Sequence, residues 1–395
     1  MEIGYLLQDL REYLRVSRSR KALRQPGQGA DYAAATDTVQ QLADRLHPKR
    51  MRLRVTEIWH ETPTAKTLRF ERIDGPLPPF RPGQYINLAV DVDGVLTSRP
   101  YSIASPPGAD HLDLTVRDKV DGFVAPYLLN EVQVGDELET TGPSGSFYHE
   151  PLIDGDDLVF LAGGSGITPF MSIVREAFAG EGTAPPLQMN LLYGSRSPDD
   201  VIYGQELADL AANHLSFRYS PVISEPPPGY GGLTGFLSAD LIRQQVGDVQ
   251  GKTFYICGPN VMYDYCLAAL TELDVPRHKI KRELYGPPDD VTQEVGWPQD
   301  VAPGTMFSVQ VEDPTLEDRK EIRVAAGEPL LNSLERYGIV VPAICRAGEC
   351  SACRTRLLSG QIYQPAHTGL RESDRQYGYI HACVSYPLQD LEIRI

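Results

Sequence analysis

The sequence predicts a multidomain protein with an antiparallel β-barrel, a parallel-sheet α/β domain and a C-terminal α+β domain, preceded by a helical extension. Three observations support this prediction. Short strands with Gly and Pro turns fill residues 51–150, and buried-strand and helix patterns alternate over 151–286. A hairpin, a helix and four cysteines then occupy residues 306–395. The 395 residues are enough for about two or three such domains.

Two segments are predicted to lie outside these domains. In residues 1–50 apolar side chains recur at helical spacing, as at Val39 and Leu42. We expect two helices there that pack on the rest of the protein and carry no visible chemistry. Residues 287–305 are rich in proline and acidic residues, a composition that is typical of a linker.

The barrel is predicted from its strands. Apolar and polar residues alternate over 52–55, 66–70 and 111–117, and residues 84–90 follow a Pro-Gly turn. Alternation places one face of a strand in a core and the other in solvent. Several short strands of this kind favour a barrel that ends near Tyr148.

The α/β domain is predicted from strands and helices that follow one another in turn. This order is typical of a parallel sheet with helices packed on its faces. The expected strands are 158–162, 188–193, 217–222, 253–257 and 279–284, and the expected helices are 169–179, 204–212, 238–245 and 261–273.

Four cysteines in the last domain predict a 2Fe–2S cluster. Cys345, Cys350 and Cys353 have the spacing C-x4-C-x2-C, and Cys383 follows at a distance, which is the plant-type arrangement. The small residues of the loop allow backbone amides to approach the sulfurs. A structural zinc site usually has two short Cys pairs. Disulfides are the other alternative, and they are rare in the reducing cytoplasm, where we expect this chain.

A second set of motifs lies in the barrel. An Arg at a strand end can bind phosphate, a Tyr offers a flat face to a ring, and a Ser offers a hydroxyl group. The chain has these residues as Arg99-Pro100-Tyr101-Ser102, followed by Val116-Arg117 and by the turn Gly122-Phe123-Val124.

The order and spacing of these motifs resemble the ferredoxin–NADP⁺ reductase superfamily. The resemblance implies that Arg99 binds the flavin phosphate, that Tyr101 packs on the isoalloxazine ring and that Ser102 lies near flavin N5. Ala125 stands where the family often has Ser or Thr against the pyrophosphate. FAD is therefore the expected flavin, and FMN is the alternative.

A glycine-rich turn follows the first strand of the α/β domain and opens a helix, an arrangement that suits a diphosphate. By resemblance this is the nicotinamide-nucleotide loop, with Thr168 between flavin and nicotinamide. Its residues are Gly163-Gly164-Ser165-Gly166-Ile167-Thr168-Pro169.

The next strand ends in Gly194-Ser195-Arg196, where family members bind the adenosine end of the coenzyme. Ser195 and Arg196 suit a 2′-phosphate, whereas Asp199 and Asp200 would repel one. We expect NADH, with NADPH as the alternative.

Three further residues match the family late in the α/β domain. Cys257-Gly258-Pro259 and Met262 fit the family's C-G-P-x-x-M pattern, which places Cys257 near nicotinamide C4. Glu283 fits a terminal Glu-x-aromatic pattern that faces the flavin, and there it is expected to assist proton balance. Cys266 and the histidines, including His111, His214 and His381, are expected at surface or packing positions.

Taken together, the resemblance implies an NAD(P)H-dependent iron–sulfur flavoprotein reductase with a β-grasp ferredoxin domain. The domain order resembles that of the reductase components of phthalate, phenylacetate and vanillate oxygenases. A hydride would pass from NADH to the flavin, and single electrons would pass through the cluster to an oxygenase or another metalloprotein. Arg346 and Glu349 are expected to face this acceptor. The alternative is a regulatory subunit that binds nucleotide without sustained turnover.

Composition limits the partners. The formal net charge of −16 argues against nucleic acid. No apolar run approaches the roughly 18 residues of a membrane helix, and the first residues lack the pattern of a signal peptide. We therefore expect a cytoplasmic protein without a membrane span.

Overall fold

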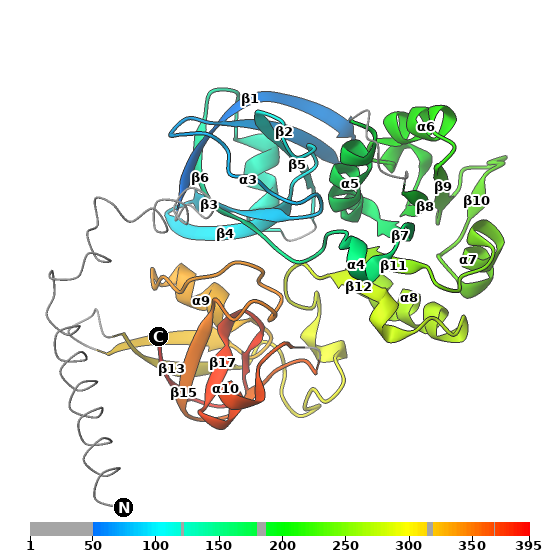
Figure 1. Cartoon of the computed structure of the whole chain (residues 1–395). Helices are drawn as coiled ribbons and strands as arrows, with labels where there is room; N and C mark the ends of the chain where they lie inside the picture. Colours follow the sequence, from blue (N-terminus) through cyan, green and yellow to red (C-terminus); the bar gives the residue numbers. More distant parts are fainter. Residues whose placement is uncertain (1–49, 120–121, 180–186, 314–318, 367) are drawn as a thin grey trace, which may run out of the picture. The chain divides into compact units, whose positions relative to one another are not determined.

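The computed structural model describes residues 50–119, 122–179, 187–313, 319–366 and 368–395. Residues Arg50–Ile395 form one compact unit. The two helices expected in residues 1–50 lie outside the described residues. Within the unit, two six-stranded sheets and one five-stranded sheet follow one another along the chain (Figure 1).

The first sheet is antiparallel and closes into the expected barrel. Its strands are ordered β4-β3-β6-β1-β2-β5, and a bridge between Ile103 and Leu114 joins the two ends. Along β1 the apolar residues Met51, Leu53 and Val55 are buried, as alternation requires. The bounds are β1 Met51–Thr62, β2 Ala65–Arg72, β3 Tyr85–Val92, β4 Val95–Ser102, β5 His111–Arg117 and β6 Glu137–Ser144, with helix α3 Ala125–Asn130.

The second sheet is parallel and has the order β10-β9-β8-β7-β11-β12. Helices α5 and α6 pack with one apolar cluster of the sheet, and α7 and α8 pack with another. The strands are β7 Asp157–Gly163, β8 Gln188–Ser195, β9 Phe217–Ile223, β10 Leu233–Thr234, β11 Thr253–Cys257 and β12 Ile280–Glu283. The helices are α4 Pro151–Asp154, α5 Thr168–Phe178, α6 Gly204–Asn213, α7 Ala239–Val246 and α8 Asn260–Glu272.

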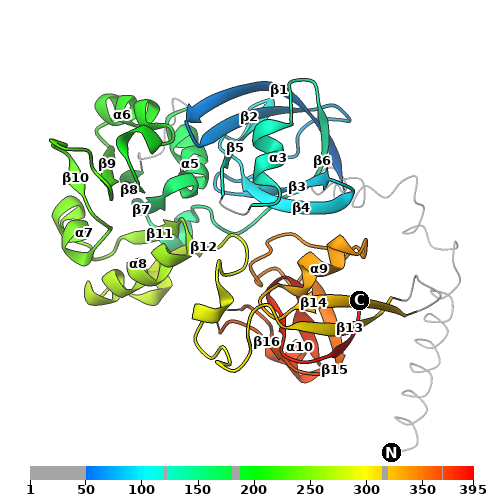
Figure 2. The same ribbon diagram turned by 180° about the vertical axis from the view of Figure 1, so that it is seen from behind.

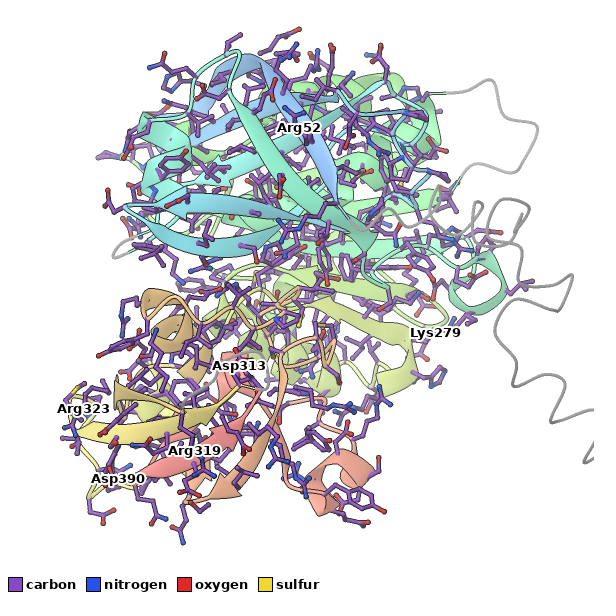
Figure 3. All side chains as sticks on the ribbon, turned by 90° about the vertical axis from the view of Figure 1, so that its left-hand side faces the viewer. Arg52, Lys279, Asp313, Arg319, Arg323 and Asp390 are labelled. Carbon is purple, nitrogen blue, oxygen red and sulfur yellow. The ribbon has the colours of Figure 1, made fainter. Side chains whose placement is uncertain are left out.

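The third sheet is mixed and has the order β14-β13-β19-β15-β17. The expected hairpin forms β13 Met306–Glu312 and β14 Lys320–Ala325, and β13 pairs in parallel with β19 Leu391–Arg394. Arg323 and Asp390 lie on the outer surface of this sheet (Figure 3), where Asp390 accepts a hydrogen bond from Ser308 N. The other elements are α9 Leu330–Arg336, β15 Arg354–Ser359, β16 Ile362–Tyr363, α10 Glu372–Gln376, β17 Tyr379–His381 and β18 Tyr386–Pro387.

The segment 287–305 packs against a separate two-stranded sheet, formed by β16 and β18 of the C-terminal domain. Trp297 is buried and meets the rings of Tyr363 and Tyr386 edge to face, at centroid distances of 5.3 and 6.2 Å. Tyr363 Oη donates to the Val295 carbonyl at 2.8 Å. The proline-rich segment is therefore anchored on the C-terminal domain. Among the described residues, no helix is long and apolar enough to span a bilayer.

Candidate functional site

Ser102 and Tyr101 lie at the carboxyl end of β4. Ser102 is buried and its hydroxyl is hydrogen-bonded to the phenol of Tyr285, which follows β12 in the α/β domain. The ring of Tyr285 meets that of Tyr85 edge to face at 6.5 Å. Tyr285 therefore joins the barrel motif to the second domain. In the sequence, only its position directly after Glu283-Leu284 indicates that Tyr285 belongs to this site.

Arg99 is a largely buried cation on the same strand. Its guanidinium donates to Thr97 Oγ1 at 2.7 Å and to the Ser98 carbonyl at 2.8 Å, which are both uncharged acceptors. Burial, and then the nearby Arg346 cation, lower the pKa of Arg99 to about 10. A buried guanidinium without its own carboxylate needs an anion. The arrangement fits the phosphate of a flavin nucleotide.

Among the other barrel residues of the motifs, Arg117 contacts the α/β domain. Val116 is buried, while Arg117 forms an ion pair with Asp200 and lies against Gly164, whose absent Cβ would be 2.5 Å from Arg117 Nη1. At the turn before α3, Gly122 is close to the Lys119 carbonyl. The next two residues differ in exposure, since Phe123 is partly exposed and Val124 is buried.

In the α/β domain, the predicted residues meet at the carboxyl edge of the parallel sheet. The register places Gly163 beside Gly194, Ala162 beside Cys257 and Cys257 beside Glu283. This is the edge at which open parallel sheets bind ligands. Glycine is required here, because a Cβ on Gly166 would collide with the Cys257 carbonyl and lie 2.6 Å from Gly258 N.

The two loops at this edge also pack through Met262. A Cβ on either Gly163 or Gly258 would lie 2.5 Å from Met262 Sδ, and one on Gly163 would lie 3.0 Å from Pro259 Cδ. Thr168, the first residue of α5, donates its hydroxyl to the Ser165 carbonyl at 2.7 Å, and Pro169 follows it. The glycines thus let the turn pack closely against the loop after β11, and the turn leads into the N-terminus of α5, where helix geometry suits a diphosphate.

Cys257 and Glu283 end neighbouring strands and are both buried. Burial, followed by the charge of Glu283, raises the pKa of the Cys257 thiol. Burial, followed by Glu349 and Cys345, raises the pKa of the Glu283 carboxyl group. The Cys257 thiol is therefore protonated at neutral pH, and the Glu283 carboxyl group keeps its proton to a higher pH than an ordinary glutamic acid does. Cys266 is buried in the core of this domain, as expected.

At the expected site for the adenosine end of the coenzyme, the structure differs from the sequence prediction for Asp200. Asp200 does not face a 2′-phosphate, because its carboxylate pairs with Arg117 and accepts Thr64 Oγ1 at 2.6 Å. Arg196 instead faces Glu225, which lies beyond the end of β9, at 3.6 Å, and both side chains are 71% exposed. Ser195 is buried beside Arg196. Glu225 is a residue that the sequence analysis missed.

The four predicted cysteines come together as two pairs. Cys350 N points at Cys345 Sγ at 3.4 Å, and the sulfurs of Cys353 and Cys383 are 3.2 Å apart. Within the described residues, no three His, Cys, Asp or Glu side chains are placed to hold one metal ion. Two pairs fit two irons with two thiolates each, which is the donor set of a 2Fe–2S cluster.

The two cysteines of the first pair differ in exposure, and this gives the cysteine loop a direction. Cys345 is buried in the same apolar cluster as Tyr85 of the barrel and Leu284 of the α/β domain. Cys350 is exposed. The Cys345 thiol, followed by backbone amides, lowers the pKa of Cys350 to about 6. One side of the cluster site therefore faces the other domains, and the other side faces solvent.

His381 holds the cysteine loop in place. It is fully buried, its Nδ1 donates to the Gly348 carbonyl at 2.7 Å, and its Nε2 lies 3.1 Å from Ser351 Oγ. Gly348 and Ser351 have φ angles of +78° and +60°, which L-residues other than glycine seldom adopt. His381 therefore does more than pack, because it bridges Gly348 and Ser351, the two positions of positive φ. By contrast, His214 packs as expected, stacked on Phe178.

Arg346 contradicts the expectation that it faces an acceptor. Its side chain is 4% exposed and forms an ion pair with Glu335, which is also buried. It also donates to Thr97 Oγ1 of β4 at 3.0 Å. Glu349, the other residue expected there, is exposed. Local sequence gave no sign that Arg346 would turn inward.

Together with the fold, these sites define a flavin- and NAD-binding oxidoreductase that carries a 2Fe–2S domain. Comparison with family models agrees. Residues 55–149 match the oxidoreductase FAD-binding domain, residues 160–267 match the oxidoreductase NAD-binding domain, and residues 315–388 match the 2Fe-2S iron-sulfur cluster binding domain.

Known proteins are similar to this chain over most of its length. The ferredoxin reductase component of 3-ketosteroid-9-alpha-monooxygenase from Mycobacterium tuberculosis is 31% identical over 353 residues, which are 86% of this chain and 94% of that protein. The glycine betaine monooxygenase reductase subunit of Chromohalobacter salexigens is 28% identical over 87% of this chain and 95% of its own length. The structure of phthalate dioxygenase reductase superposes with a TM-score of 0.64 at 22% identity, covering 88% and 98% of the two chains.

The chain therefore belongs to the ferredoxin–NADP⁺ reductase superfamily, in the family of FAD- and NAD-dependent reductases that carry a 2Fe–2S domain.

Proposed function

We propose that this protein takes a hydride from NADH and delivers single electrons to the terminal component of an oxygenase. The observation that carries the proposal is the position of the cysteine loop: Cys345 is buried in one apolar cluster with Tyr85 and Leu284, while Cys350 is exposed. A bound flavin accepts two electrons as a hydride and releases them singly, and a 2Fe–2S cluster carries one. The loop thus lies between the flavin and coenzyme domains on one side and solvent on the other.

Several side chains have roles in this proposal. Arg99 binds the flavin phosphate, and Tyr101 provides a face for the flavin ring. Ser102 and Tyr285 lie next to the reacting edge, where one hydroxyl donates a hydrogen bond to the other. Cys257 and Glu283 line the coenzyme side, where the raised pKa of each group favours its neutral form.

The coenzyme is NADH in this proposal. Support comes from Glu225, whose carboxylate faces Arg196 beyond the carboxyl edge of the sheet. A carboxylate accepts hydrogen bonds from a ribose hydroxyl and repels a 2′-phosphate. Its pairing with Arg196 also reduces the positive charge that a 2′-phosphate would need.

The proposal also includes the division of the chain and its location. Residues 51–150 bind flavin, 151–286 bind the nicotinamide nucleotide, 287–305 connect, and 306–395 bind the cluster. The oxygenase names of the relatives and the exposed side of the cluster site support a protein acceptor. We place the protein in the cytoplasm, where NADH is supplied and thiols stay reduced.

The variant Cys345→Ser tests the electron path. It removes the thiolate on the flavin side of the cluster, so we expect rapid bleaching of the flavin by NADH in stopped flow but loss of cytochrome c reduction. The control is Cys266→Ala, which changes a buried cysteine of the α/β domain and is expected to preserve both steps. Normal reduction of the acceptor by Cys345→Ser protein would refute the path.

A further inference from the structure

The hydroxyl of Thr97 joins the flavin side of the barrel to the cysteine loop. Thr97 is buried in β4 and donates to Glu335 Oε2 at 2.9 Å. It accepts from Arg99 Nη1 at 2.7 Å and from Arg346 Nη2 at 3.0 Å. A hydroxyl has one proton and two lone pairs, so this single group uses its full capacity on three charged partners.

The three partners come from distant parts of the chain. Arg99 lies on β4 beside Thr97, Glu335 lies on α9, and Arg346 directly follows the cysteine Cys345. In Figures 1 and 2 helix α9 lies next to β4, and the two elements are in contact. A second hydrogen bond also joins the barrel to the segment before the cysteine loop, since Asn87 Nδ2 of β3 donates to the Ala343 carbonyl at 2.6 Å.

The charges of this group do not balance. Arg99 and Arg346 are cations, and Glu335, which pairs with Arg346, is the one carboxylate in the group. The closeness of Arg346 also contributes to the lowered pKa of Arg99. Because a buried excess of positive charge is costly, a phosphate at Arg99 would complete the group.

We propose that Thr97 couples flavin binding to the docking of the cluster domain. A phosphate bound at Arg99 would hold the Arg99 guanidinium in one position. The guanidinium would then orient the Thr97 hydroxyl, and this hydroxyl would hold Glu335 and Arg346 through its hydrogen bonds. Docking then places Cys345 against the flavin side of the protein. By linkage the effect is reciprocal, so a docked cluster domain favours flavin binding by the same factor. The coupling rests on the proposed flavin-binding role of Arg99.

Hydrogen exchange tests the coupling without measuring turnover. The full chain is prepared with its cluster loaded and its flavin removed, and FAD is then added back. We expect amide exchange in Leu331–Arg336 of α9 to slow about 5-fold or more on FAD binding. Exchange in Phe307–Val311 of β13, which lies outside the network, should not change.

The variants Thr97→Val and Thr97→Ser separate the effect of the Thr97 hydroxyl from the effect of the side chain's shape. In Thr97→Val protein FAD should bind on the order of 10-fold more weakly, and saturating FAD should no longer protect α9. Thr97→Ser keeps the hydroxyl and should restore both effects. Glu372→Gln is the control on the cluster domain, because Glu372 pairs with Arg375 of α10, away from α9 and from this group.

The outcomes distinguish the coupling from the proposed function. If FAD binds normally but leaves α9 unprotected in the unaltered chain, or protects it equally in Thr97→Val protein, the coupling is wrong and the flavin site stands. If the unaltered chain does not bind FAD, both proposals fail. Since the first result needs no variant, the test does not depend on the folding of Thr97→Val protein.

Discussion

At the scale of single residues, Glu283 shows how burial sets the state of a carboxyl group. It ends β12 beside Cys257, and burial, Glu349 and Cys345 all raise its pKa above the ordinary value of 4.5. The folded protein therefore holds a proton on Glu283 at a pH at which the unfolded chain has lost it. A neutral carboxyl group can donate a hydrogen bond or a proton near the flavin, whereas a carboxylate would only accept.

The raised pKa of Glu283 predicts a pH dependence of stability. Because the native state binds more protons than the unfolded state, the free energy of unfolding falls as the pH rises from 4.5 towards the raised pKa. Glu283→Gln imitates the protonated form and should flatten this slope and stabilise the protein at about pH 7 relative to about pH 5. Urea unfolding at both pH values measures it. The exposed Glu272, changed to Gln, is the control, and an unchanged slope in Glu283→Gln protein would contradict the assignment.

The contacts of His381 with the cysteine loop predict that this residue slows the loss of the cluster. His381→Leu leaves the Gly348 carbonyl and the Ser351 hydroxyl without their buried partner, at a cost of about 1–3 kcal/mol for each unsatisfied group. The loop should then release iron at least about 10-fold faster. Bleaching of the cluster absorbance by a chelator gives the rate, with His278→Leu as the control at an exposed site. Equal rates in the two variants would mean that His381 does not hold the loop.

At the scale of elements, local patterns predicted most of the fold. The strand expected at 253–257 is β11 without change, and the helix expected at 261–273 is α8 Asn260–Glu272. These segments carry strong period and turn signals of their own. The parallel pairing of β13 with β19 has no such signal, because it depends on two segments about eighty residues apart.

The candidate site likewise contains residues that local sequence predicts and residues that it does not. Cysteine spacing and glycine turns are local, so they were visible in the sequence, and the structure brings those residues together. Arg346 is 249 residues from Thr97 in the chain. Nothing near Arg346 in sequence distinguishes an arginine that faces solvent from one that pairs with Glu335. Tyr285 and Glu225 also depend on strands that meet only in the folded sheet.

The contact between Glu225 and Arg196 beyond the carboxyl edge of the parallel sheet predicts a preference for NADH over NADPH. Glu225→Arg would replace the carboxylate that faces Arg196 with a second cation suited to a phosphate. The ratio of kcat/KM for NADH to that for NADPH should fall by about 10-fold or more, since each 1.4 kcal/mol changes it tenfold. Asp209→Arg, on α6, makes the same charge change away from the edge and should leave the ratio unaltered. An unchanged ratio in Glu225→Arg protein would place the adenosine end elsewhere.

At the scale of the whole molecule, the connection between domains is itself packed. Trp297 fixes the segment 287–305 on the cluster domain through Tyr363 and Tyr386. Tyr386 lies close to the cluster site, since Cys383 contributes to the raised pKa of its phenol, after the larger effect of burial. The segment therefore limits how far the cluster domain can move from the α/β domain that precedes it.

Trp297→Ala should weaken this attachment and leave the flavin and coenzyme sites intact. Removing a buried Trp side chain costs about 3–5 kcal/mol, so the cluster domain should unfold at a lower temperature, followed by the loss of cluster absorbance. Bleaching of the flavin by NADH should be unchanged, whereas reduction of cytochrome c should slow because Cys345 is less often docked. Val295→Ala, at an exposed position of the same segment, is the control. If Trp297→Ala slowed the bleaching of the flavin as much as cytochrome c reduction, the segment would be part of the coenzyme side rather than an anchor for the cluster domain.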